Sequence, residues 1–82
     1  MSKVVVAAAT DVQVHTGSSS AVIIANGGSS RLHLNKSAVS TAGAAIELDS
    51  GDSIAMEAGS DWAASDWYGW SDVGSLAVVT TF

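Results

Sequence analysis

Apolar and polar residues alternate in several short stretches of this chain, most clearly in residues 45–57 (AIELDSGDSIAME). The alternation is interrupted by Asp-Ser-Gly-Asp, a typical turn sequence, and then resumes. Because side chains alternate between the two faces of a strand, only an odd-numbered loop puts both apolar sets on one face. We therefore predict a β-hairpin with a three-residue loop over residues 49–51, in which Gly51 takes a positive φ. The shared face would carry Ile46, Leu48, Ile54 and Met56.

A second hairpin is predicted on either side of the turn sequence NGGSS. Residues 21–25 (AVIIA) form the most apolar stretch, which favours a central position in a sheet. Residues 31–35 (RLHLN) follow the turn and alternate in hydrophobicity. A three-residue loop centred on Gly28 pairs the two strands and puts four apolar residues on one face, namely Val22 opposite Leu34 and Ile24 opposite Leu32.

Further strands are predicted toward the two ends of the chain. Residues 11–16 (DVQVHT) indicate a half-buried strand, with valines on one face and Gln13 and His15 on the other. Residues 4–9 are either an opening strand or a small-residue arm that pairs with a neighbouring molecule. Residues 75–82 (SLAVVTTF) alternate throughout and predict the closing strand.

The segments between these strands are predicted to be mostly loops. Residues 36–43 are polar and small, which is typical of a loop. Residues 61–66 favour a loop with one helical turn that Asp61 would cap, because Gly69 argues against a long helix. A strand is predicted over residues 67–71.

Seven or eight short strands at close spacing predict an all-β protein, a small antiparallel β-sandwich or a jelly-roll-like barrel. Residues 1–10 would form the N-terminal arm or first strand, and residues 11–82 a single domain. The chain has 82 residues, no cysteine, 48% hydrophobic residues and only 13% charged residues. A domain this small without disulfides has a thin stability margin. We therefore expect a homo-oligomer, most simply a trimer.

The net charge of −5, with Lys3, Arg31 and Lys36 as the only basic residues, argues against binding to nucleic acid or to an anionic membrane. The longest early apolar run has six residues, which is too short for a signal-peptide core. We expect a protein made in a cytoplasm without a leader.

Candidate catalytic or metal-binding residues are sparse. His15 and His33 lie opposite apolar faces, so both are predicted to face solvent, and neither belongs to a cluster with zinc-ligand spacing. Asp49 and Asp52 could suggest calcium, but turn aspartates commonly bind their own backbone, and the EF-hand pattern is missing. No GxSxG motif indicates a serine hydrolase. The sequence predicts no enzyme and no cofactor.

Four aromatic residues form the one unusual local feature: Trp62, Trp67, Tyr68 and Trp70. They could fill the core, form a subunit or partner interface, or make a carbohydrate-binding surface with the neighbouring aspartates. Alternation puts Tyr68 and Trp70 on one face and Trp67 on the other, so at least one should point outward.

The order of segments resembles that of small bacteriophage virion proteins. The resemblance rests on DVQVHT, AVIIAN with a Gly-Ser turn, RLHLN, AIELDSGDSIAM, WYGWSD and SLAVVTTF, and it covers residues 11–82. It implies a small β-sandwich that serves as a head decoration, fibre or tail-associated subunit, without catalytic residues. The expected function is a capsid decoration (cement) subunit that binds the major capsid protein or another virion protein. A fibre, collar or tail subunit is one alternative, and a carbohydrate-binding module is another.

Overall fold

The computed structural model describes residues 1–37 and 46–82, which form eight β-strands and no helix. The predicted loop over residues 36–43 lies mostly outside the described residues. The strands are β1 (Ser2–Val6), β2 (Val12–His15), β3 (Val22–Asn26), β4 (Leu32–Asn35), β5 (Ile46–Leu48), β6 (Ser53–Met56), β7 (Trp67–Trp70) and β8 (Ser75–Thr81).

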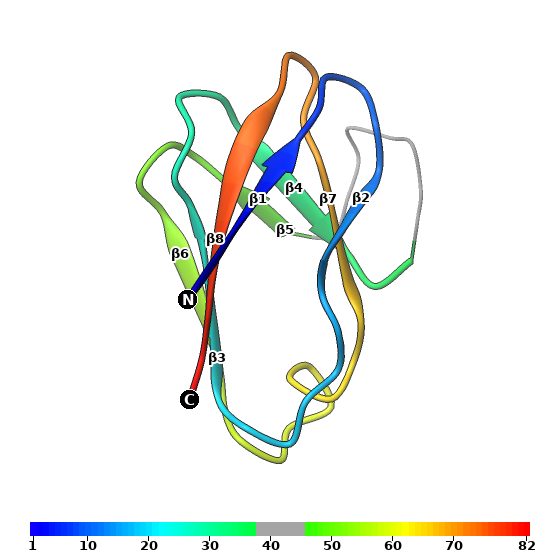
Figure 1. Cartoon of the computed structure of the whole chain (residues 1–82), viewed down its shortest axis with the longest axis vertical. Helices are drawn as coiled ribbons and strands as arrows, with labels where there is room; N and C mark the ends of the chain where they lie inside the picture. Colours follow the sequence, from blue (N-terminus) through cyan, green and yellow to red (C-terminus); the bar gives the residue numbers. More distant parts are fainter. Residues whose placement is uncertain (38–45) are drawn as a thin grey trace.

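The strands form two four-stranded antiparallel sheets that pack face to face (Figure 1). The first sheet has the order β1-β8-β3-β6 and the second β2-β7-β4-β5. Strand pairing is nested along the chain, because β4 pairs with β5, β3 with β6, β2 with β7 and β1 with β8. A long antiparallel hairpin rolled over into two sheets gives this order, which is that of a jelly roll. The predicted all-β sandwich is confirmed.

Both predicted hairpins are wrong in their pairing, although their strands are where the sequence places them. The strand β5 pairs with β4 and not with β6, and β3 pairs with β6 and β8 and not with β4. The turns after β3 and after β5 each carry the chain from one sheet to the other. The predicted apolar residues still point to a common core, but they meet across the sandwich.

Gly51 has a φ of +87°, as predicted, but in a different turn from the bulged loop that the alternation suggested. The amide of Asp52 donates to the carbonyl oxygen of Asp49 over 2.9 Å, which closes a four-residue turn. A residue with positive φ at the third position is typical of a type II turn. As expected of a turn aspartate, the Asp52 carboxylate accepts a hydrogen bond from the backbone N–H of Asp49.

The core fills the space between the sheets with alternate residues from their facing sides. Twelve buried residues form it: Val6, Val14, Val22, Ile24, Leu32, Leu34, Leu48, Met56, Ala63, Trp67, Ala77 and Val79. Gly69 also faces this core, where a Cβ would lie 3.1–3.2 Å from methyl groups of Val6, Val14 and Leu32. The glycine therefore leaves room for these three side chains.

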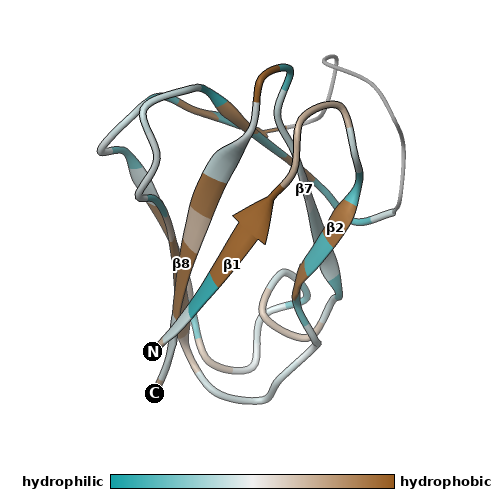
Figure 2. Ribbon diagram, turned by 45° about the horizontal axis from the view of Figure 1, so that its top comes forward, coloured by the Kyte–Doolittle hydropathy of each residue, from teal (hydrophilic) through white to brown (hydrophobic). Residues whose placement is uncertain are grey.

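The N-terminal segment forms an edge strand, since β1 pairs with β8 over its whole length. Its two faces differ in environment, because Val6 is fully buried whereas its neighbour Val5 is exposed. The two termini lie on the same side of the molecule (Figures 1 and 2). Beyond β1, Ala8 forms an isolated parallel bridge with Ser71, so the chain passes from the first sheet to the second at this point.

Candidate functional site

The aromatic segment begins with a tight turn in the connection between β6 of the first sheet and β7 of the second. The amide of Ala64 donates to the carbonyl oxygen of Ser60, which makes the single helical turn that the sequence predicts. The cap is Ser60 and not Asp61, because the Ser60 hydroxyl accepts the amide N–H of Ala63. This turn holds Trp62 at the surface, with 44% of its area exposed.

Trp67 and Trp62 contact each other but differ in burial. Their ring centroids are 5.6 Å apart at an interplanar angle of 60°. The indole N–H of Trp67 donates a 2.8 Å hydrogen bond to the carbonyl oxygen of Trp62, which links the turn to β7. Trp67 is only 2% exposed and belongs to the core. One tryptophan is thus anchored, and it supports the other at the surface.

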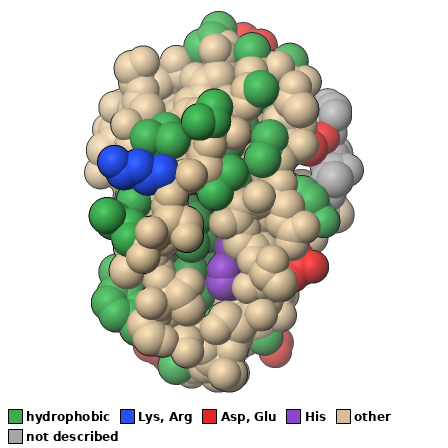
Figure 3. All heavy atoms as spheres, in the orientation of Figure 1, with side chains coloured by type: hydrophobic (Ala, Val, Ile, Leu, Met, Phe, Trp, Pro, Cys, Tyr) green, Lys and Arg blue, Asp and Glu red, His purple; other side chains and the backbone are tan. Residues whose placement is uncertain are grey.

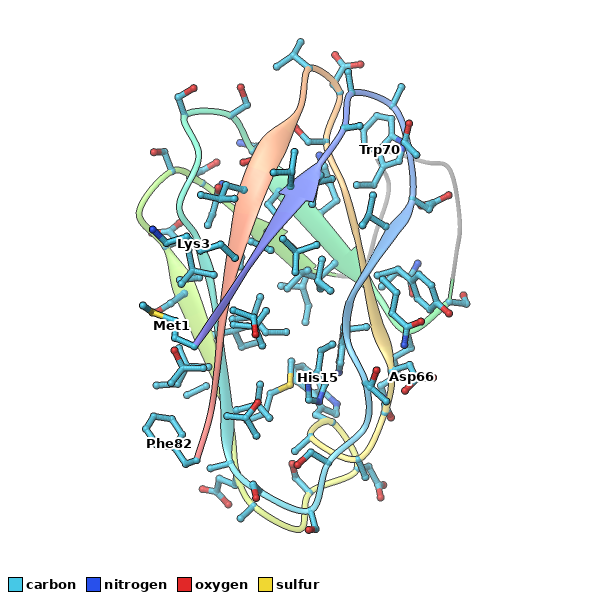
Figure 4. The ribbon with its side chains drawn as sticks, in the orientation of Figure 1. Met1, Lys3, His15, Asp66, Trp70 and Phe82 are labelled. Carbon is cyan, nitrogen blue, oxygen red and sulfur yellow. The ribbon has the colours of Figure 1, made fainter. Side chains whose placement is uncertain are left out.

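Trp70 lies elsewhere, on the outer side of the second sheet beside His33. The two residues are cross-strand partners, and their rings meet edge to face at 5.6 Å. Tyr68, on the same side of β7, is half-buried. The structure therefore does not gather the four aromatic residues into one surface, because Trp70, labelled in Figure 4, packs against His33, whereas Trp62 packs against Trp67.

His33 is buried, contrary to the prediction that it faces solvent. It does point away from the core, as alternation requires, but Trp70 covers its ring. Its Nδ1 lies 3.8 Å from the Glu47 carboxylate, too far for a hydrogen bond. Within the described residues, three buried polar atoms here have no hydrogen-bond partner: His33 Nδ1, Trp70 Nε1 and Ser71 Oγ.

His15 is also buried, and the same prediction is wrong for a different reason. A β-bulge between Gln13 and His15 shifts the register of β2 against β7. The irregularity breaks the alternation, and both Val14 and His15 become buried. His15 Nε2 lies 3.0 Å from the carbonyl oxygen of Ala63, so the ring has a polar partner inside the sandwich (Figure 4).

A half-open pocket of about 210 Å³ lies beside the Trp62–Trp67 pair. Most of its wall is apolar. We call it the Trp62 pocket, and its lining residues are Asn35, Lys36, Ile46, Trp62 and Trp67. Of these residues, the sequence pattern indicated only the two tryptophans as candidates for a site, because Asn35 and Lys36 come from the end of β4, which lies far away in the chain.

The basic side chains of Arg31 and Lys36 have different surroundings. Arg31 donates a 2.9 Å hydrogen bond to Asp49 and lies 3.8 Å from Glu47, and the Asp49 hydrogen bond raises its pKa above the usual value. The Lys36 ammonium instead lies over the Trp67 ring, 5.9 Å from its centroid. Within residues 1–37 and 46–82, no carboxylate forms an ion pair with Lys36. The Trp62 pocket therefore contains a cation whose charge is not neutralised by a neighbouring acid.

The outer side of the first sheet is the second notable surface. Its four strands contain no Asp or Glu, and Lys3 is their only charged residue. Register and burial assign to this side, which we call the apolar sheet face, the residues Lys3, Val5, Ile23, Ala25, Ser53, Ala55, Leu76, Val78 and Thr80. Figure 3 shows hydrophobic side chains around the blue Lys3, with acidic side chains only toward the rim of the view. Strand β1 is brown over most of its length in Figure 2.

Among residues 1–37 and 46–82, no group of three or more His, Asp or Glu side chains is arranged to hold a metal ion. No helix in the same part of the chain is long and apolar enough to cross a membrane. Comparison with family models, curated proteins and solved structures found no match to this chain.

Proposed function

We propose that this protein is a non-enzymatic structural subunit of a bacteriophage virion, a decoration protein that stabilises the outer face of the head. The observation that supports this most is the apolar sheet face, because an antiparallel sheet normally exposes polar residues on its solvent side. Val5 is 73% exposed on this face, and Met1 and Phe82 are exposed at the ends of the adjacent strands. Such a contiguous apolar surface is typical of a protein–protein contact.

The occupant of the apolar sheet face in this proposal is a second copy of the same chain. Each copy carries a net charge of −5, so two copies repel each other wherever their acids meet. All eight acidic residues lie outside the strands of the first sheet. This face therefore lets two acidic subunits approach without opposing carboxylates, and it buries surface that a small domain cannot cover alone.

The fold is compatible with this role. Jelly rolls occur in viral capsid domains and in lectins, so the topology alone does not choose between functions. The head location is the expectation that follows from the segment order described above. A fibre, collar or tail subunit is the alternative, and the copy number distinguishes the two, since a shell needs hundreds of copies and a vertex or tail about a dozen.

Two experiments test the proposal. The first measures the mass of the native protein in solution by light scattering, where an oligomer is expected and a monomer at all concentrations would rule out self-association. The second examines purified virions, made from the genome that encodes this chain, by mass spectrometry and electron microscopy. Density on the outer face of the head is expected, and absence of the chain from the particles would end the virion role.

A further inference from the structure

The Trp62 pocket combines an exposed aromatic platform with a rigid support. Trp62 exposes 44% of its surface, and its backbone carbonyl is held by the buried Trp67 indole. The Trp62 ring also packs against the buried Trp67 ring, with centroids 5.6 Å apart, and this contact restricts its movement when no ligand is bound. An immobile aromatic face is suited to a flat, partly apolar ligand, because little ordering entropy is lost on binding.

Hydrogen-bond donors predominate among the described polar groups of the pocket. The Lys36 ammonium and the Trp62 indole N–H can only donate. Asn35 offers both kinds of group, because its Oδ1 accepts the backbone N–H of Lys36 over 2.8 Å and keeps a second acceptor site, while its Nδ2 can donate. The Trp62 carbonyl oxygen already accepts two hydrogen bonds, from the Trp67 indole and from the Ser65 amide. The Lys36 ammonium, which has no carboxylate partner in the described part of the chain, favours a ligand with a negatively charged acceptor.

We propose that the Trp62 pocket binds an acidic sugar residue of a glycan, a hexuronic or sialic acid. The apolar face of the pyranose ring stacks on Trp62, and its carboxylate accepts hydrogen bonds from Lys36 Nζ and Asn35 Nδ2. The volume of about 210 Å³ is below the roughly 300–1,000 Å³ of pockets for drug-sized ligands, which suits one sugar ring better than a large ligand. The proposal does not depend on the assembly role of the apolar sheet face.

The test is a titration of the folded protein with methyl glucuronide and, separately, with methyl glucoside, which differ only in the carboxylate. Nuclear magnetic resonance follows the indole N–H signals of the three tryptophans and the amide of Lys36. We expect methyl glucuronide to shift the signals of Trp62 and Lys36, while the Trp70 signal remains unchanged because that ring lies on the outer side of the second sheet. The glucoside should bind at least about tenfold more weakly, as expected from losing the charge-assisted hydrogen bonds that the carboxylate accepts from Lys36 and Asn35.

Matched variants separate the site from general charge effects. Lys36→Gln should remove the preference for the glucuronide, and Trp62→Ala should weaken binding roughly tenfold. Lys3→Gln makes the same charge change on the apolar sheet face and should leave the titration unchanged. Lys36, Lys3 and Trp62 are all exposed, so these variants should fold, which circular dichroism would confirm.

Several results would overturn the proposal. It fails if neither sugar shifts the signals of the pocket, or if both sugars bind equally. It also fails if Lys3→Gln weakens binding as much as Lys36→Gln, because the effect would then be non-specific. Binding of benzoate without binding of the glucuronide would show that the pocket recognises an aromatic carboxylate and not a sugar.

Discussion

The side-chain amide of Asn26, at the end of β3, donates a 2.9 Å hydrogen bond to the carbonyl oxygen of Leu48 in the opposite sheet. Its Nδ2 also donates to the Ser30 carbonyl oxygen, and its Oδ1 accepts hydrogen bonds from the Gly28 amide and the Ser75 hydroxyl. Both donors and both acceptor sites of the amide are thus used. The buried Asn26 side chain therefore links three segments: the turn after β3, the end of β5 and the start of β8.

We expect Asn26→Asp to destabilise the fold strongly. The substitution keeps the shape of the side chain but puts an oxygen where an N–H now faces the carbonyl oxygens of Ser30 and Leu48. A buried carboxylate beside two acceptors should lower the free energy of unfolding by about 3 kcal/mol. Urea denaturation measures this difference. The control is Asn35→Asp, whose side chain is only half-buried, and equal effects of the two changes would contradict the role assigned to Asn26.

The two contacting tryptophans should differ sharply in their contribution to stability. Trp67→Ala removes a core side chain and is expected to cost roughly 3–5 kcal/mol, whereas Trp62→Ala should change stability by about 0.5 kcal/mol or less. Because Trp67→Ala could prevent folding altogether, Trp67→Phe is the second variant, in which the hydrogen bond to the Trp62 carbonyl is lost but much of the ring volume stays. Thermal unfolding followed by circular dichroism ranks the three variants, and a larger effect at Trp62 than at Trp67 would be inconsistent with the structure.

Gly69→Ala should destabilise by overpacking. The new methyl group would press on side chains of Val6, Val14 and Leu32, at an expected cost of about 1–3 kcal/mol. Removing methyl groups from one of these neighbours should relieve the contact, so Val14→Ala combined with Gly69→Ala should be less destabilising than the sum of the two changes. Gly51→Ala is the comparison, because no heavy atom lies within 4 Å of the added Cβ, so that any loss of stability comes from the positive φ at this position. Purely additive effects of the Gly69 and Val14 changes would refute the overpacking explanation.

A negative charge introduced on the apolar sheet face should dissociate the proposed oligomer without unfolding the subunit. Val5→Glu puts a carboxylate on the apolar sheet face. In an oligomer this carboxylate would be buried against the same face of a second copy. We expect the mass measured by light scattering to fall to that of one chain while the circular dichroism spectrum remains unchanged. Val73→Glu is a matched control, since Val73 is 70% exposed and lies outside the first sheet. Dissociation by both substitutions alike would show that net charge, and not this face, controls association.

The positions of the strands could be predicted from the sequence, because alternation is a local property that a strand carries wherever it pairs. The predicted stretch at residues 21–25 corresponds to β3, an inner strand of the first sheet, and residues 75–82 correspond to β8. Pairing could not be predicted in the same way. A turn such as the one that contains Gly51 can return the chain beside the strand it has left or carry it into the other sheet, and both outcomes put the same residues in the core.

The histidines and tryptophans show a second limit of the sequence pattern. The bulge in β2 changes the orientation of His15, and Trp70 covers His33, although both residues alternate with apolar neighbours. Of the aromatic residues, alternation separates Trp67 from Trp70 correctly but cannot indicate that Lys36 lies over the Trp67 ring. Lys36 reaches that ring only because β4 and β7 are neighbours in the second sheet.

The amino-acid sequence by itself determined that this chain is an all-β protein, where its strands lie and which aliphatic side chains of the predicted hairpins face the core, because these depend on the period of two within each strand. Only the tertiary structure decided which strands pair, how the rolled hairpin divides into two sheets, that one sheet exposes a face without carboxylates, and that the end of β4 meets the aromatic turn. These features depend on contacts between residues far apart in the chain. Packing and hydrogen bonding at such contacts, as at Asn26, stabilise the pairing, and no local sequence pattern records them.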